Sequence, residues 1–267
     1  MIKRHTVIWL EILFLIALTW QPKAWALSAE ERGLEIAKEG ERRDEGWGNF
    51  RASLIMILKN QRGETSVRRI RSMTLEGTDD GDKSLLIFDS PADVKDTKFL
   101  TFSHKHSDDD QWLYLPALKR VKRISSSNKG GSFMGSEFSY EDMTAPVLEK
   151  YDYKYLGDDN YKGRKVFLVE RYPKDPHSLY SKQVTWTDQE HYIPWKIEYF
   201  NRRGKHLKTL TYHKYKRYLG QFWRPGKMLM VNHQTGKATA LVWKKYRFRD
   251  KSIKENLFNP AALPRLR

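Results

Sequence analysis

Most of the chain alternates between apolar and polar residues, and one helical segment precedes this region. Residues 28–31 read Ser-Ala-Glu-Glu, a capping box in which Ser28 and Glu31 satisfy each other's backbone amides. The pattern predicts a helix that begins after Ser28 and ends near Arg43. From residue 49 the apolar period changes to two, which predicts a half-buried strand over residues 49–59.

Short strand-like runs then recur almost to the end of the chain. Further strands are predicted at residues 64–76, 83–90, 97–106, 110–115, 121–124, 151–157, 164–171, 182–187, 193–200, 205–218, 222–232 and 237–249. Polar, glycine-rich turns separate them, so strands adjacent in sequence should pair as an antiparallel meander. About twelve strands exceed a comfortable flat sheet. The sequence therefore predicts a mainly β fold, one domain whose sheet curls into a barrel or half-barrel.

The one long interruption is residues 125–146, a Ser- and Gly-rich stretch followed by an apolar cluster. We predict a short helix over residues 136–143, with Glu137, Glu141 and Asp142 on its solvent-exposed face. A loop of this length inside a compact β domain is usually functional. A surface excursion is the alternative, but the apolar side chains need burial, and the open end of a half-barrel offers it. We therefore expect a mobile lid over a cavity.

Aromatic residues form stripes on single faces of the predicted strands. Trp112 and Tyr114 share a face, as do Trp195, Ile197 and Tyr199. Such stripes are often core packing, but a half-open sheet leaves a cavity that such side chains can line, and it would bind an apolar ligand through the hydrophobic effect. The candidate residues of the cavity and lid are Trp112, Tyr114, Phe133, Met134, Phe138, Tyr140, Trp195 and Tyr199.

Charge and composition narrow the partner classes. The 267 residues include 49 Lys and Arg against 33 Asp and Glu, a net charge of +16, and no cysteine. The missing cysteine excludes disulfides, thiolate metal sites, a cysteine nucleophile and a lipid-modified cysteine. The positive charge indicates an anionic partner: nucleic acid, an anionic membrane surface or an acidic protein. Arg120, Lys122 and Arg123, interleaved with apolar residues, are candidate membrane contacts or a strand edge that discourages aggregation.

The N-terminus reads as a cleavable secretory signal over residues 1–26. Lys3 and Arg4 precede a run over residues 7–20 that is apolar apart from Glu11, and Ala-Trp-Ala at residues 24–26 is a cleavage site. An uncleaved anchor is the alternative, but the run falls short of the ~20 apolar residues that span a bilayer. Export leaves residues 27–267 as the mature domain and argues against a nucleic-acid partner.

Motifs for chemistry are missing from the sequence. It contains no phosphate-binding glycine loop, nucleophile elbow or zinc motif. His104 and His106 lie in a run of charged residues with no spaced partner to complete a metal site, so we expect a charged hairpin turn. We therefore predict no catalytic residue, no metal and no cofactor; a secreted enzyme with a concealed site stays an alternative.

Two stretches resemble a known family. Residues 112–124 read Trp-Leu-Tyr-Leu-Pro-Ala-Leu-Lys-Arg-Val-Lys-Arg-Ile, and residues 131–143 read Gly-Ser-Phe-Met-Gly-Ser-Glu-Phe-Ser-Tyr-Glu-Asp-Met. With them the chain resembles the bacterial outer-membrane lipoprotein-sorting proteins, the LolA-like periplasmic carriers, in particular the branch encoded beside resistance-nodulation-division type exporters.

The resemblance implies an unclosed, strongly curved antiparallel sheet with helices on its concave side. It also implies a periplasmic protein that binds lipid or lipoprotein acyl chains and carries them toward the outer membrane. A resistance-nodulation-division type exporter is the membrane partner that this branch suggests, and no catalytic residue carries over. A periplasmic sensor of lipid or protein, built on the same half-barrel, is the alternative function.

Overall fold

The computed structural model describes residues 27–266, so the predicted signal segment, residues 1–26, lies outside the described residues. Helix α1 (Ala29–Arg43) begins as the sequence predicts. The backbone amide of Ser28 donates to Glu31 Oε2 at 2.8 Å, and the amide of Glu31 donates to Ser28 Oγ at 3.1 Å. Two of the amides at the helix start are thereby satisfied, which holds the first turn in place. Within residues 27–266 no helix is both long and apolar enough to cross a membrane.

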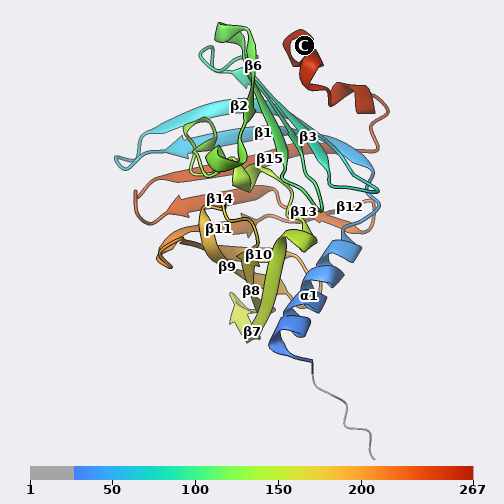
Figure 1. Ribbon diagram of the computed structural model, residues 1–267, viewed down its shortest axis with the longest axis vertical. Helices are drawn as coiled ribbons and strands as arrows, with labels where there is room; N and C mark the ends of the chain where they lie inside the picture. The colour runs from blue at the N-terminus through green and yellow to red at the C-terminus, as the bar shows by residue number, and fades with distance from the viewer. Residues whose placement is uncertain (1–26, 267) are drawn as a thin grey trace, which may run out of the picture.

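Fifteen strands follow α1 (Figure 1). They are β1 (Asn49–Lys59), β2 (Thr65–Leu75), β3 (Lys83–Ser90), β4 (Lys98–Phe102), β5 (Asp110–Leu115), β6 (Arg120–Ile124), β7 (Tyr151–Tyr161), β8 (Arg164–Pro173), β9 (Tyr180–Asp188), β10 (Pro194–Asn201), β11 (His206–His213), β12 (Lys216–Tyr218), β13 (Phe222–Arg224), β14 (Lys227–Asn232) and β15 (Ala238–Phe248).

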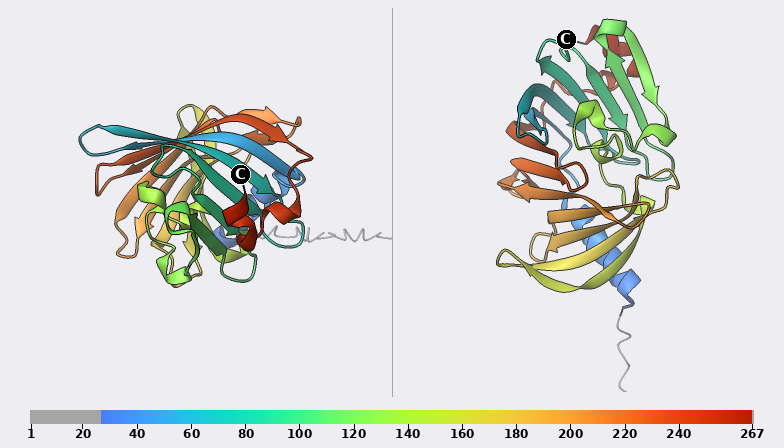
Figure 2. Two further views of the ribbon diagram at one scale, coloured as in Figure 1. Left: turned by 90° about the horizontal axis from the view of Figure 1, so that it is seen from above. Right: turned by 90° about the vertical axis from the view of Figure 1, so that its left-hand side faces the viewer.

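Thirteen of these strands form one antiparallel sheet in the order β6-β5-β4-β3-β2-β1-β15-β14-β11-β10-β9-β8-β7. The sheet curves strongly without closing, which confirms the predicted half-open, mainly β fold (Figure 2). Its two edge strands, β6 and β7, are consecutive in sequence. Their connection must therefore run from one edge of the sheet to the other, and this is why residues 125–150 cross the concave side.

Two predicted strands are broken in the structure. Residues 205–218 divide into β11 and β12, and residues 222–232 divide into β13 and β14. β12 and β13 form a separate two-stranded hairpin, because Lys214 takes a left-handed backbone (φ 57°) that ends β11. The hairpin places Phe222 against Trp47 and Phe50, beside the end of α1.

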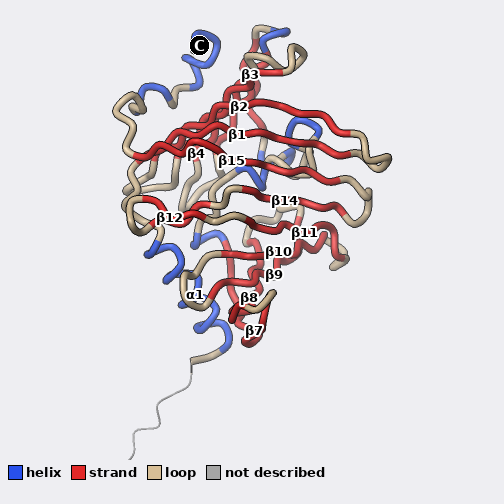
Figure 3. The backbone as a smooth tube through the Cα atoms, turned by 180° about the vertical axis from the view of Figure 1, so that it is seen from behind, coloured by secondary structure: helices blue, strands red, loops and turns tan. Residues whose placement is uncertain are grey.

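Both faces of the sheet are packed. The main core lies on the concave face, where residues 129–143 meet strands from both halves of the sheet. On the opposite face, residues 250–266 cover β3, β4 and β5 with the 3₁₀ turns η6 (Glu255–Leu257) and η7 (Pro260–Arg265). In Figure 3 this C-terminal segment lies beyond β3, at the end of the molecule remote from α1. Ile253, Phe258 and Leu263 are the buried apolar residues that it contributes.

The segment between the two edge strands is helical only as single 3₁₀ turns. These are η2 (Ser126–Asn128), η3 (Phe133–Gly135), η4 (Glu141–Met143) and η5 (Leu148–Lys150), in place of the short helix expected at residues 136–143. The backbone instead folds back on itself, since the amide of Phe133 donates to the carbonyl of Phe138 at 2.8 Å. Gly135, at φ 74°, makes this reversal at little steric cost. We call residues 129–143 the plug.

Candidate functional site

A cavity of about 1180 Å³ opens between α1 and the concave face of the sheet. Ligand pockets in proteins usually hold roughly 300–1,000 Å³, so this one is large enough for an extended molecule. From α1 it is lined by Ile36 and Ala37. The apolar residues that line it from the sheet include Leu86, Val169, Ile197, Met228 and Leu241.

The register of the strands explains how distant residues reach one cavity wall. Val169 on β8 pairs with Thr185 on β9, which in turn pairs with Ile197 on β10. Paired residues in an antiparallel sheet point to the same face. A row of side chains from three strands therefore faces the cavity, and Thr185 is the small, polar member of the row.

Trp112 and Tyr114 lie on the other face of the sheet, which corrects their expected place in the cavity. Both pack in the cluster beneath residues 250–266. Their neighbour Leu113 points to the concave core instead. Strand β5 is apolar on both faces because the C-terminal segment covers the outer one. The alternation in the sequence consequently does not tell which face is the inner one.

A β-bulge displaces Trp195 from the row that the alternation predicts. Pro194 pairs with Thr187, and the next pair is Lys196 with Trp186, so Trp195 is the extra residue. Pro194 lines the cavity in its place. The indole of Trp195 donates to Asp188 Oδ2 at 2.9 Å, and the guanidinium of Arg164 stacks on its ring at 4.2 Å.

The remaining aromatic candidates lie on the concave side, but mostly beneath the plug. Tyr199 is 4% exposed and packs against Tyr180, with ring centroids 4.8 Å apart. Phe133 is fully buried against Phe99 at 4.8 Å. Met134 and Tyr140 pack beside the same core. Phe138 alone among these candidates lines the cavity, so the plug is a part of the core that also closes one end of the cavity.

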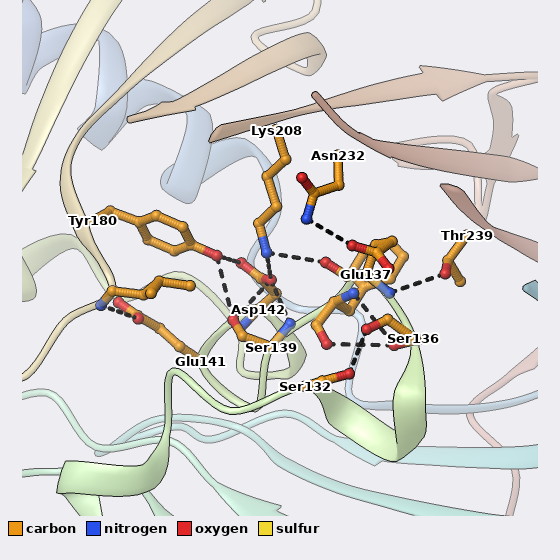
Figure 4. Close-up of polar contacts among 12 residues, drawn as sticks. Ser132, Ser136, Glu137, Ser139, Glu141, Asp142, Tyr180, Lys208, Asn232 and Thr239 are labelled. Atoms are coloured by element: carbon orange, nitrogen blue, oxygen red, sulfur yellow. Dashed lines mark hydrogen bonds and ion pairs between the residues drawn. The ribbon is translucent and has the colours of Figure 1, made fainter. Parts of the chain in front are cut away.

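A buried polar network attaches the plug to the sheet (Figure 4). Lys208 Nζ on β11 lies 2.6 Å from Asp142 Oδ2, and the two side chains are 3% and 4% exposed. The hydroxyl of Tyr180 donates to Asp142 Oδ1 at 2.7 Å, and the hydroxyl of Ser139 donates to Asp142 Oδ2 at 2.8 Å. We call these four residues the latch. Each oxygen of the buried carboxylate has a partner, as a buried charge requires.

Further polar contacts extend from the latch. Asn232 Nδ2 donates to Glu137 Oε2 at 2.7 Å, and Lys208 Nζ donates to the carbonyl of Glu137 at 3.0 Å. Glu141 accepts from the backbone amide of Leu179 at 3.0 Å, and burial raises the pKa of the Glu141 carboxyl. The expectation that Glu137, Glu141 and Asp142 face solvent is therefore wrong, because the plug turns these carboxylates toward strands that supply their donors.

The basic residues Arg120, Lys122 and Arg123 are all exposed on the edge strand β6. Arg123 forms an ion pair with Asp110 on the neighbouring strand β5. Exposed charge on an edge strand discourages pairing with another chain. The same placement leaves the three side chains accessible to an anionic surface, so both interpretations of this edge stand.

The turn at residues 104–110 is charged, as the sequence predicts. His104 contacts Asp80 through Nδ1 at 2.5 Å and Asp110 through Nε2 at 3.4 Å, and these side-chain hydrogen bonds outweigh burial and raise the pKa of the imidazole. In the described part of the chain, no group of three or more His, Asp or Glu side chains is placed to hold a metal ion.

Carboxylates line the end of the cavity near the C-terminus of α1. Burial raises the pKa of Glu41 and of Asp44, and an ion pair with Arg224 opposes the effect at Asp44. Burial also raises the pKa of Asp82 to about 6, although the backbone amide of Gly77 donates to its carboxylate at 3.0 Å. Asp82 therefore changes charge near neutral pH at the cavity wall.

Replacing Asp82 with asparagine is expected to stabilise the protein above pH 6. The folded-state pKa of Asp82 lies above its ordinary value of 3.8, so the folded protein binds the proton more tightly. Stability is then lost as the pH rises from about 4 to about 6, and D82N removes this loss. Urea unfolding should show D82N more stable by about 1–2 kcal/mol at pH 7.5 and by only about a third of that at pH 4.5.

The control for this comparison is D79N, in the same turn but exposed, which should leave stability nearly unchanged at both pH values. An equal gain for D82N at pH 4.5 and pH 7.5 would contradict the raised pKa.

Two charged residues of the concave face were missed by sequence reasoning. Arg171 follows Phe167 and Val169 at a spacing of two, and Lys208 precedes Leu210 and Tyr212 in the same way. In each strand a cation occupies a position that the apolar alternation assigns to the inner face. That conflict between charge and period was the signal available in the sequence.

Comparisons with known proteins agree with this architecture. The chain is similar to an outer membrane lipoprotein-sorting protein domain from Vibrio parahaemolyticus, with 53% identity and a TM-score of 0.86 over 88% of this chain and 99% of that chain. A DUF1329 family protein from Desulfovibrio piger is 29% identical, with a TM-score of 0.83 over 89% of this chain and 100% of that chain.

More distant comparisons concern the fold. A LolA superfamily protein from Nitrosomonas europaea is 18% identical, with a TM-score of 0.67 over 88% of this chain and 98% of that chain. A family model with the description "Uncharacterized protein" matches residues 80–265. A search of curated protein sequences finds no significant match.

Proposed function

We propose, from the premise that this chain belongs to the LolA-like family of outer membrane lipoprotein-sorting proteins, that it is a periplasmic carrier of acyl chains. The carrier shields the acyl chains of a lipid or lipoprotein in its cavity during transport toward the outer membrane. Residues 1–26 direct export and are removed, and residues 27–267 form one half-barrel domain. The observation that carries the proposal is the cavity of about 1180 Å³ with its wall of apolar residues from α1 and the sheet.

The energetics of such a cavity suit a carrier. Burying an acyl chain of ~14 carbons gains on the order of 10 kcal/mol before ordering costs, at about 0.8 kcal/mol for each methylene. The gain is non-directional, so chains of different length can share one cavity. No catalytic group is needed for this work, and a donor or acceptor in the membrane, such as a resistance-nodulation-division type exporter, completes the route.

The test of this proposal is a search for lipid in the protein itself. Mass spectrometry of protein purified without detergent should detect acyl lipid at close to one molecule per chain. After delipidation, the protein should bind a fluorescent fatty acid or phospholipid again. Protein that carries no lipid and binds none after delipidation would contradict the carrier function.

Replacing Thr185 with tryptophan is expected to block the cavity. Thr185 lies in the cavity wall between Val169 and Ile197, so a larger ring fills ligand space and leaves the core unchanged. We expect binding of the fluorescent lipid to fall at least about 10-fold, equivalent to about 1.4 kcal/mol. The control is T65W, at an exposed position of β2. Unchanged binding in T185W would place the ligand elsewhere.

A further inference from the structure

Arg171 lines the cavity and has no carboxylate partner among the residues that the structure describes, and we propose that it forms a binding site for the anionic headgroup of the ligand. The inference rests on the proposed carrier function and narrows it. The ligand class is an amphiphile in which a carboxylate or phosphate adjoins a long acyl chain.

The position of Arg171 is set by the sheet. It lies on β8, paired with Tyr153 on β7 and with Gln183 on β9. Its Nε–H donates to Gln183 Oε1 at 2.6 Å, and its guanidinium lies 4.9 Å from the ring centroid of Tyr151. One edge of the guanidinium is therefore fixed, which orients its terminal nitrogens.

Those terminal nitrogens have no partner among residues 27–266. No described carboxylate lies within ion-pair distance of Arg171, and the bond to Gln183 is the hydrogen bond that its side chain makes. Two other cations of the concave side do have carboxylate partners: Lys208 pairs with Asp142, and Arg224 pairs with Asp44. A cation in an apolar cavity is favourable once an anion joins it. A guanidinium also presents two parallel N–H groups to a carboxylate or a phosphate.

Tyrosine hydroxyls supply further donors around Arg171. Tyr199 and Tyr212 are close enough to Arg171 to interact with it electrostatically. Neither hydroxyl has a hydrogen-bond partner in the described part of the chain, and Tyr212 lines the cavity. A phenol hydroxyl donates to a carboxylate or phosphate oxygen. Arg171 and Tyr212 therefore present donors to the cavity that no acceptor among residues 27–266 satisfies.

The surrounding charges favour an anion at this place. The carboxylate of Asp142 lies on the same side of the sheet but is neutralised by Lys208 at 2.6 Å. The other acidic residues of the cavity wall, such as Glu41 and Asp82, belong to α1 and to the turn before β3. Val169, two residues before Arg171, begins the cavity-facing row that continues through Thr185 to Ile197. A headgroup at Arg171 would thus leave its acyl chain against apolar side chains.

The experiment compares pairs of ligands that share an acyl or alkyl chain of sixteen carbons and differ in whether the headgroup is anionic. Delipidated protein is titrated with palmitate and 1-hexadecanol, and with palmitoyl lysophosphatidic acid and monopalmitoylglycerol. Wild-type protein should bind at least one anionic ligand 10-fold or more tightly than its neutral counterpart. Preference for palmitate indicates a fatty acid carboxylate, and preference for the lysophosphatidic acid indicates a phospholipid phosphate.

Variants then assign the preference to the site. R171Q should lose the charge preference while it keeps its affinity for the neutral ligands, and R171K should retain part of it. Y212F should reduce the preference several-fold. The matched control is R69Q, an exposed arginine on β2, which should behave as wild type.

The outcomes separate this inference from the carrier function. Equal affinity of the wild-type protein for charged and neutral ligands would overturn the anion site. A full charge preference in R171Q would overturn it as well. Neither result would contradict the carrier function. Failure of every ligand to bind wild-type protein overturns the carrier function. Should R171Q not fold, the wild-type ratio together with Y212F still decides the question.

Discussion

Replacing Lys208 with methionine is expected to lower the free energy of unfolding by about 3–5 kcal/mol, because the substitution leaves a buried carboxylate without its counter-charge. Asp142 Oδ2 lies 2.6 Å from Lys208 Nζ, and both side chains are nearly inaccessible to water. Lys208 Nζ also donates to the carbonyl of Glu137, and it lies over the rings of Tyr180 and Tyr199. Denaturant unfolding at neutral pH measures the loss.

The double variant K208M/D142N separates the lost ion pair from the stranded charge. An asparagine at position 142 keeps an acceptor for Tyr180 and carries no charge, so the double variant should recover most of the stability. K205M, an exposed lysine in the turn before β11, is the matched control and should change stability by less than about 0.5 kcal/mol. A K208M protein as stable as wild type would show that the latch does not hold the plug.

The latch variants also test whether the plug moves. Loss of the latch should raise amide hydrogen exchange over residues 130–143 more than in β1 (Asn49–Lys59), because local opening follows the weakest contacts. In wild-type protein, lipid loading should change exchange over the same residues if they act as a lid. The edge-to-edge path of this segment places it where such motion would open the cavity.

Replacing Phe133 with alanine is expected to lower the free energy of unfolding by about 3–5 kcal/mol, since a fully buried ring is removed from the core. Phe133 packs between Phe88 and Phe99, with ring centroids 6.1 Å and 4.8 Å away. The surrounding strands cannot collapse into the space, so a cavity term adds to the lost burial. Thermal or urea unfolding measures the effect. M134A, at a partly buried neighbour, should cost less.

The F133A variant also tests whether Phe133 acts as a core residue or as a side chain that competes with lipid for the cavity. Phe133 packs in the core and Phe138 lines the cavity, so F133A should change lipid affinity less than it changes stability. A ring that rests in ligand space, in contrast, would compete with lipid, and its removal would raise affinity. Lipid titration of F133A at a temperature where it stays folded decides between them. A rise in affinity of 10-fold would contradict the core assignment.

Local patterns in the sequence were sufficient for the helix and for most strands of this fold, but not for residues 136–143 or for the breaks after β11 and β13. The capping box at Ser28 and the period of two after residue 49 located α1 and most strands, because each depends on neighbours a few residues apart. The resemblance of residues 112–124 and 131–143 supplied the family, and the 53% identity with the Vibrio parahaemolyticus domain supports it. The interruption at residues 125–146 was also visible in the sequence, with its apolar residues marking it for burial.

The tertiary structure decided which face of each strand points toward the cavity. Trp112 and Tyr114 alternate with Leu113, and only the C-terminal segment that covers the outer face determines that the aromatic pair points away from the cavity. Trp195 leaves its row through a bulge that the pairing of β9 with β10 creates. Neither orientation can be predicted from neighbouring residues. The segment that covers β5 is remote in sequence, and the bulge at Trp195 depends on how β9 and β10 pair.

The buried charges also show the difference between what the sequence predicts and what the tertiary structure decides. The residues after Ser136 suggested an exposed acidic face, yet Asp142 is buried because Lys208, 66 residues later, meets it across the open sheet. A charge at an inward position costs stability unless a partner arrives, and the partner depends on the order of strands across the whole sheet. The sequence by itself thus determined the helix and most strands and, through the family resemblance, the unclosed β architecture. Long-range pairing decided which carboxylates, cations and aromatic rings meet at the cavity.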